Sequence, residues 1–322
     1  MKALVCRAIS EDIGTLRLEE VSLPPPARGE VRVRIRAAAV NFPDILTVQG
    51  KYQHKPALPF TPGMEAAGEV VACGADVVSV KPGDRVIAGG LGCFAEEVQL
   101  PETSLRPTPA GIDDALAAGF TAAYLTAYVG LVRRARLEKG EWLLVHGAAG
   151  GVGLAAADLG RALGAKVMAT ASTDVKRAFL QRYGVDRVLP SSGFREQVKA
   201  LSGGRGADVI FDPVGGDVFD ESTRCIAFDG RLLVVGFASG RIPEIGANIP
   251  LIKGFSVVGM RAGEYGRRFP ERGRENIAAI DGMLGEGLLH PCVGARFPLD
   301  RAADAMRMLL ERRAVGKVIV EP

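Results

Sequence analysis

The sequence has few of the residues that bind metals. Among its 322 residues there are three histidines, His54, His146 and His290, and none of them forms an HxxxH or HExxH pair. The five cysteines are widely scattered and include no CxxC pair. A zinc site needs clustered Cys, His or carboxylate ligands, and a disulfide framework needs paired cysteines. The sequence therefore predicts no metal site, and it favours a reducing compartment.

Strong net charge and a secretory signal are also absent. The formal net charge is +3, which gives no reason to expect nucleic-acid binding. The N-terminus, MKALVCRAISED, lacks the long apolar core of a signal peptide. Residues 115–132 carry no charge, but they are rich in Ala, Thr, Gly and Tyr rather than in Leu, Ile and Phe. We expect a buried helix there, no membrane association and a cytoplasmic location.

The hydrophobic pattern divides the chain into two parts. The N-terminal part contains short strands and Pro-Gly turns, and residues 30–40 alternate Val or Ile with Arg like a half-buried strand. From Glu141 onwards strands alternate with helices, which is typical of a parallel, doubly wound sheet in an α/β fold. The six strands expected in this sheet are residues 142–146, 166–171, 186–190, 208–212, 231–237 and 255–260.

A glycine-rich loop follows the first of these strands. It reads Gly147-Ala148-Ala149-Gly150-Gly151-Val152-Gly153, with Gly150 and Gly153 at the second and third glycine positions of a GxGxxG motif. The second glycine lets the backbone approach a pyrophosphate, and the helix that follows directs its N–H groups at the phosphates. We therefore expect dinucleotide binding; the alternative is a tight strand–helix turn without a ligand.

The next strand indicates which dinucleotide is bound. NAD sites usually place Asp or Glu about 20 residues after the glycines, where it accepts hydrogen bonds from the ribose. Ala171 stands at that place, and Ser172 and Lys176 follow it. A hydroxyl and a cation suit a 2′-phosphate, so the sequence favours NADPH. The alternative is that Lys176 belongs to the solvated face of the next helix.

Several segments in the same order resemble the zinc-independent quinone oxidoreductases of the medium-chain dehydrogenase/reductase superfamily, which includes the zeta-crystallins. The resemblance covers essentially the whole chain and rests on residues 40–70, the HGAAGGVG loop, FDPVGGDVF, VVGFASGRIPEI and RRAVGKVIV. It implies a GroES-like, β-barrel-type substrate domain of residues 1–118, completed by 261–322. A Rossmann NADPH-binding domain of residues 119–260, with a six-stranded parallel sheet, is expected between these segments.

The resemblance also implies roles for individual residues. In zinc-dependent relatives a histidine precedes the glutamate of PGMEAAGEV, whereas this chain has Met64, in agreement with a metal-free enzyme. Many relatives have a tyrosine near the adenosine phosphate where this chain has Pro190. Tyr52 is the expected catalytic residue. The expected cofactor-binding residues are Asn41, Thr126, Gly150, Gly151, Val152, Ser172, Lys176, Phe237, Ala238 and Lys317.

Three functions remain open at this point. The leading hypothesis is NADPH-dependent reduction of a quinone or another conjugated carbonyl compound, because an enzyme without a metal needs an acceptor that is already electrophilic. The second is reduction of a 2-enoyl thioester or an acryloyl-type substrate, and the third is a non-catalytic, crystallin-like NADPH-binding protein. Tyr52, Thr126 and Lys317 can also have ordinary structural roles. We expect a homodimer joined through Phe255–Met260, since that strand lies at the sheet edge.

Overall fold

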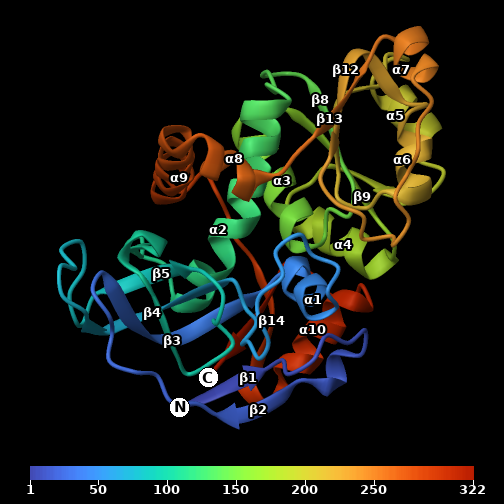
Figure 1. Cartoon of the computed structure of the whole chain (residues 1–322). Coiled ribbons are helices and arrows are strands. Elements are labelled where there is room, and N and C mark those ends of the chain that lie inside the picture. Colours follow the sequence, from blue (N-terminus) through green and yellow to red (C-terminus); the bar gives the residue numbers. More distant parts are fainter. The chain divides into compact units, whose positions relative to one another are not determined.

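The computed structural model describes all 322 residues, which form two compact units (Figure 1). Unit 1 contains Met1–Thr121 and Pro291–Pro322, and unit 2 contains Ala122–His290. The sequence predicts that residues 261–290 complete the first unit, but in the structure they belong to unit 2. The reason is local packing: Arg133 donates hydrogen bonds to Glu275 Oε2 at 2.7 Å and to Asn276 Oδ1 at 2.8 Å.

Unit 1 is built mainly from antiparallel strands. A seven-stranded sheet has the order β14-β15-β3-β4-β5-β7, with β6 also paired to β3, and β1 pairs with β2. Its elements are β1 (Lys2–Val5), β2 (Arg17–Glu20), β3 (Glu30–Val40), α1 (Phe42–Val48), β4 (Glu65–Cys73), β5 (Arg85–Gly89), β6 (Glu97–Pro101), β7 (Leu105–Pro107), β14 (Val293–Pro298), α10 (Ala302–Leu310) and β15 (Lys317–Glu321), with short 3-10 helices at Ile13–Thr15, Glu102–Ser104 and Leu299–Arg301.

The long strand β3 organises the core of unit 1. Val31, Val33 and Ile35 are buried while the arginines between them point outward, as the alternation predicts. Along the same edge β3 pairs first with β6 and then with β15, and its register shifts twice opposite β4. Such irregularities increase strand twist. They let one sheet curl around an apolar core, in agreement with the GroES-like fold expected from the sequence.

Unit 2 is a doubly wound sheet with the strand order β10-β9-β8-β11-β12-β13, in which all neighbouring strands are parallel. The six predicted strands and the α/β fold class are confirmed. The strands are β8 (Trp142–Val145), β9 (Lys166–Ala171), β10 (Arg187–Pro190), β11 (Ala207–Asp212), β12 (Ile226–Val234) and β13 (Ser256–Gly259).

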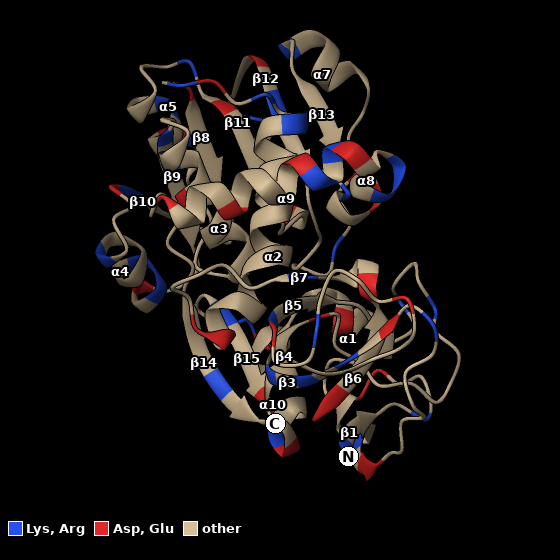
Figure 2. Ribbon diagram, turned by 90° about the vertical axis from the view of Figure 1, so that its left-hand side faces the viewer, with Lys and Arg blue, Asp and Glu red and all other residues tan.

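Helices flank this sheet, with α5 and α6 on the right-hand side of Figure 1. The helices that lie wholly within unit 2 are α3 (Gly151–Ala162), α4 (Asp174–Arg182), α5 (Arg195–Leu201), α6 (Gly216–Ser222), α7 (Asn248–Lys253), α8 (Ala262–Arg268) and α9 (Pro270–Gly285). Figure 2 shows acidic and basic residues together on helices such as α4 and α8. This mixture agrees with the small net charge of the sequence.

The apolar segment that resembles a membrane span is a core helix. α2 (Asp114–Tyr128) continues into a π-helical turn at Val129–Arg134, and residues 114–134 are long and apolar enough to cross a membrane. However, 61% of the most apolar window is buried within the protein. Ala115, Ala117 and Ala118 pack against Ala37 and Ile319 of the unit 1 sheet, where small side chains permit close contact. The expected buried helix is therefore present.

Candidate cofactor-binding site

Most of the predicted cofactor-binding residues lie at the carboxyl ends of the strands in unit 2. From β8 the chain adds β9 and β10 on one side of the sheet and then returns to add β11, β12 and β13 on the other. In open parallel sheets, ligands bind at the carboxyl edge where the strand order reverses in this way. The segments that follow β8, β9 and β12 carry Gly150, Gly151, Val152, Ser172, Lys176, Phe237 and Ala238.

The glycine loop has the geometry that a pyrophosphate needs. Gly150 caps the N-terminus of α3, and no side chain accepts hydrogen bonds from the first N–H groups of the helix. A Cβ atom on Gly150 would meet only the Gly147 carbonyl oxygen, at 3.4 Å, so the outer side of the loop is open. A Cβ atom on Gly153 would lie 2.4 Å from the same oxygen, because the helix packs directly against the loop. These residues fit a bound dinucleotide.

The segment after β9 contains the residues expected to hold the 2′-phosphate. Ala171 ends the strand and is buried, whereas Ser172 is exposed and Lys176 is half-buried. The Thr173 hydroxyl caps α4 by accepting from the Lys176 backbone N–H at 3.3 Å. Arg177 is turned back onto its own helix, where it pairs with Asp174 and donates to the Ala171 carbonyl oxygen at 3.0 Å. Of the two cations, Arg177 is thus engaged by groups of its own segment.

In unit 1 the structure brings together Asn41 and Lys317, two predicted residues far apart in the sequence. Lys317 Nζ donates to Asn41 Oδ1 at 2.7 Å and lies 3.5 Å from Glu65 Oε2. Asn41 Nδ2 donates to Glu65 Oε2 at 3.1 Å and to the Ala39 carbonyl oxygen at 3.3 Å. Lys317 is 7% exposed, so it is a buried cation and not a surface charge. The amide of Asn41 is held in one orientation.

Two buried carboxyl groups complete this cluster, and the sequence analysis did not identify them. Glu65 is 3% exposed and Asp44 is fully buried. Asp44 Oδ2 accepts the Asn41 backbone N–H at 2.7 Å. Burial raises the pKa of Asp44 to about 7, although this N–H and the charge of Lys317 act in the opposite direction. The only sequence signal was the position of Asp44 three residues after an N-capping asparagine, where a carboxylate caps a helix.

Tyr52 and Thr126 lie in different units, and both are half-buried. Tyr52 follows α1, and its backbone N–H donates to the Leu46 carbonyl oxygen at 3.1 Å. An ion pair of 2.7 Å between Lys51 and Glu11 ties the same loop to the N-terminal segment. Thr126 is in the second half of α2. These contacts fix the loop of Tyr52 but assign no chemical role to its hydroxyl.

His146 is a structural residue, as its place at the end of β8 suggests. Its ring is fully buried, with Nδ1 2.9 Å from Thr170 Oγ1 and Nε2 2.8 Å from Ser222 Oγ. Because the Ser222 hydroxyl donates to the Val218 carbonyl oxygen at 2.7 Å, it accepts from His146 Nε2. Burial lowers the pKa of His146 to about 3, so the ring is neutral.

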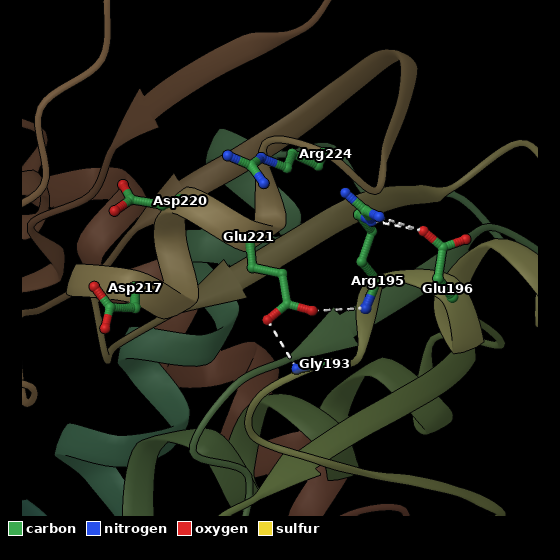
Figure 3. Close-up of a pocket in the computed structure, with 7 residues that line it drawn as sticks. All are labelled: Gly193, Arg195, Glu196, Asp217, Asp220, Glu221 and Arg224. Carbon is green, nitrogen blue, oxygen red and sulfur yellow. Dashed lines mark hydrogen bonds and ion pairs between the residues drawn. The ribbon is translucent and has the colours of Figure 1, made fainter.

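Unit 2 also has a charged pocket of about 400 Å³ that contains none of the predicted residues (Figure 3). Glu221 points into it and accepts backbone N–H groups of Gly193 at 3.0 Å and Arg195 at 2.8 Å. The other lining residues are Glu196, Asp217, Asp220 and Arg224. Nowhere in the chain do three His, Cys, Asp or Glu side chains gather as they would to hold a metal ion.

A curled antiparallel unit joined to a doubly wound unit with a glycine-capped phosphate loop defines the class of two-domain, dinucleotide-dependent oxidoreductases. Family models agree with this class. Residues 27–132 match the alcohol dehydrogenase GroES-like domain, and residues 151–279 match the zinc-binding dehydrogenase domain.

Individual proteins give a finer assignment. The quinone oxidoreductase-like protein 2 homolog of Nematostella vectensis is 42% identical over 90% of this chain and 81% of its own length. The mouse quinone oxidoreductase-like protein 2 is 38% identical over 99% of this chain and 91% of its own length. The chain therefore belongs to the quinone oxidoreductase-like proteins of the medium-chain dehydrogenase/reductase superfamily.

Solved structures of similar proteins include two kinds of enzyme. The Thermus thermophilus quinone oxidoreductase, also solved in complex with NADPH, has a TM-score of 0.87 and 33% identity over the whole of both chains. The CurK enoyl reductase has a TM-score of 0.90 and 25% identity over 99% of both chains. Quinone oxidoreductases and enoyl reductases therefore share this fold.

Proposed function

We propose that this protein is an NADPH-dependent reductase that transfers hydride to a quinone or another conjugated carbonyl acceptor without zinc. The observation that carries the proposal is the open, glycine-capped N-terminus of α3 beside a second strand that ends in Ala171 and is followed by Lys176. The quinone oxidoreductase-like relatives and the NADPH complex of the Thermus enzyme support it. Unit 2 would bind NADPH, unit 1 would bind the acceptor, and the protein would act in the cytoplasm.

Each part of the chain then has a defined task. When NADPH is bound, its nicotinamide ring supplies the hydride. The N–H groups of Gly151 and Val152 bind the pyrophosphate together with the partial positive charge of the α3 N-terminus. Ser172 and Lys176 bind the 2′-phosphate. The protein accelerates the reaction chiefly by holding the two reactants in line.

The remaining predicted residues belong to the nicotinamide end. Phe237 and Ala238 hold the carboxamide, and Thr126 faces the ring. Asn41 and Lys317 act there as a bonded pair, since Lys317 Nζ and Asn41 Oδ1 are 2.7 Å apart. Tyr52 supplies or orients a proton.

Enoyl thioester reduction is the second candidate, and it is favoured by the similarity to the CurK enoyl reductase. Hydride addition to such a substrate leaves an enolate that must be protonated. A positioned acid typically contributes about 10²–10⁴-fold to such a step. A hydroquinone anion is stable enough to take its proton from water. The dependence of turnover on Tyr52 therefore separates the two enzymes.

Replacing Tyr52 by phenylalanine is expected to lower quinone turnover by less than about tenfold, well below the contribution of a general acid. Steady-state rates with a quinone and direct NADPH binding should be measured on the same preparations. A loss of a hundredfold or more at unchanged NADPH affinity, on the scale of a general acid's contribution of about 10²–10⁴-fold, would favour the enoyl thioester reductase. Tyr128→Phe provides a control, because Tyr128 lies in α2 and has no proposed part in the reaction.

Chelation is expected to leave activity unchanged. Met64 stands where zinc-dependent relatives have a histidine, and the chain offers no cluster of ligand side chains. Turnover before and after exhaustive dialysis against a chelator should be compared with the zinc content of the purified protein. Stoichiometric zinc whose removal abolishes turnover would contradict the zinc-free mechanism.

We also propose a homodimer formed through the β13 edge. β13 is the last strand of its sheet, and Val257 on it is 37% exposed. Phe228, Leu251 and Ile252, from β12 and α7, are between 74% and 82% exposed. An apolar edge of this kind favours association. Light scattering at micromolar concentration should give the mass of a dimer, and Val257→Lys should shift it towards the monomer. A wild-type monomer would exclude this assembly.

A further inference from the structure

Asp212 ends β11, the strand that lies between β8 and β12, and its side chain is 1% exposed. Its Oδ1 atom accepts the backbone N–H groups of Val214 at 2.8 Å and Gly215 at 2.9 Å. We call residues 212–216 the β11 turn. Gly215 and Gly216 have φ angles of +69° and +58°, a region that other residues rarely adopt. The carboxylate thus holds together a turn with an uncommon backbone conformation.

The β11 turn supports the segment that contains Phe237 and Ala238. Three of its carbonyl oxygens accept hydrogen bonds from this segment: Asp212 O from Val235 N at 3.0 Å, Pro213 O from Ala238 N at 3.1 Å, and Val214 O from Ser239 N at 2.8 Å. The Phe237 ring also packs against the turn, since a Cβ atom on Gly215 would lie only 3.1 Å from it. The position of Phe237 and Ala238 therefore depends on the conformation of the turn.

The same turn lies against the glycine loop. A Cβ atom on Gly147 would be 3.2 Å from Val214 Cγ2 and 3.7 Å from Pro213 Cγ. By contrast, Ser172 and Lys176 follow β9, which is separated from β11 by β8. The β11 turn is in contact with the segments proposed for the pyrophosphate and the nicotinamide, and it lies two strands away from the segment proposed for the 2′-phosphate.

Asp212 carries a charge at neutral pH despite its burial. Burial raises the pKa of its carboxyl group to about 6, and the two N–H groups of the turn limit the rise. Hydrogen bonds to an ionised acceptor are stronger than those between neutral groups. The carboxylate is therefore well suited to hold the turn above this pH.

We infer that Asp212 is a positioning residue for NADPH: by fixing the β11 turn it sets the places of the glycine loop and of Phe237 and Ala238. The inference rests on the proposed function. Asp212 acts through the backbone of the turn and is assigned no contact with the cofactor. Its removal should weaken binding at the pyrophosphate and nicotinamide end while leaving the adenosine 2′-phosphate end intact.

The test compares two probes, NADPH and 2′-AMP, which has no 5′-phosphate, by titration calorimetry on the full chain. Asp212→Ala is expected to raise the Kd of NADPH by roughly 10- to 150-fold, the range for lost hydrogen bonds to a charged group. The Kd of 2′-AMP should stay nearly unchanged. Asp212→Asn keeps an oxygen that can accept both N–H groups but carries no charge, so its Kd for NADPH should lie between those of the wild type and Asp212→Ala.

Asp208→Ala is the matched control at the opposite end of β11. Asp208 Oδ2 also accepts a backbone N–H, that of Trp142 at 2.7 Å. Its loss should lower the melting temperature and leave the ratio of the two affinities unchanged. The inference would be overturned if Asp212→Ala lost affinity for both probes equally. It would also be overturned if Asp208→Ala changed the ratio of the two affinities as much as Asp212→Ala does.

Two further outcomes are informative. If Asp212→Ala does not fold, Asp212→Asn decides, because a positioning role requires its NADPH affinity to fall more than its affinity for 2′-AMP. An unchanged ratio of the two affinities in Asp212→Asn would then reject the role. If the wild type binds neither probe, the proposed function fails and this inference fails with it.

Discussion

Replacing Asp44 by asparagine is expected to stabilise the protein at pH 8 and to change its stability little at pH 4. The pKa of Asp44 is about 7 in the fully buried site, compared with about 3.9 in an unfolded chain. Between these values the folded state binds more protons than the unfolded state, so the free energy of unfolding decreases as pH rises. Asparagine is uncharged and still accepts the Asn41 N–H.

The expected gain in the free energy of unfolding of Asp44→Asn follows from the size of the Asp44 pKa shift. A shift of about three units corresponds to about 4 kcal/mol at about 1.36 kcal/mol per unit, fully developed above pH 7. Urea unfolding of both proteins at pH 4, 6 and 8 measures it. The pKa of His146 is lowered by burial, so its contribution makes the free energy of unfolding increase with pH below about pH 6.5. This contribution is the same in both proteins and cancels when their free energies of unfolding are subtracted.

Asp84→Asn is the control for this series. Asp84 accepts hydrogen bonds from Lys81, and these lower its pKa. Its replacement should therefore be least favourable at high pH, the reverse of the trend for Asp44. A difference between Asp44→Asn and the wild type that does not change with pH would show that Asp44 ionises normally in the folded protein.

Replacing Lys176 by alanine is expected to weaken NADPH binding and to leave NADH binding nearly unchanged. A lost hydrogen bond to a charged group costs about 1.5–3 kcal/mol, or roughly 10- to 150-fold in Kd. NADH has no 2′-phosphate, so it should not sense the change. Fluorescence titration gives the ratio of the variant Kd to the wild-type Kd for each cofactor.

Lys166→Ala removes a cation from the other end of β9, where its ammonium group lies over the Trp142 ring. This control should affect neither cofactor. Equal losses of NADPH and NADH in Lys176→Ala would mean that Lys176 does not contact the 2′-phosphate. A loss in Arg177→Ala but not in Lys176→Ala would move the phosphate contact to Arg177, which in the structure pairs with Asp174.

Local pattern was sufficient to predict the doubly wound unit. An apolar strand such as β8, a glycine loop and an amphipathic helix each have a short-range signature, and parallel strands need crossovers that fix their order within narrow limits. The third glycine is an example. Its position in the motif identifies Gly153, and a Cβ atom there would lie 2.4 Å from the Gly147 oxygen because the helix packs directly against the loop.

Features that depend on tertiary contact were not predictable in the same way. Lys317 contacts Asn41 across 276 residues of sequence and Glu65 across 252, and no local pattern signals the burial of Lys317, Glu65 or Asp44. Asp212 lies within a recognised motif, yet its role follows only from which N–H groups its carboxylate reaches. Residues 261–290 were placed in the wrong unit because α9 is held by Arg133, a contact that no local pattern reveals.

The most direct test of the proposed function is turnover with NADPH across one panel of acceptors: quinones, alkenals and 2-enoyl-CoA esters. We expect quinones to have the highest kcat/KM, with NADPH preferred over NADH for the same acceptor. A higher kcat/KM for the enoyl-CoA esters would identify a thioester reductase. Tight NADPH binding without turnover of any acceptor would contradict an enzymatic function altogether.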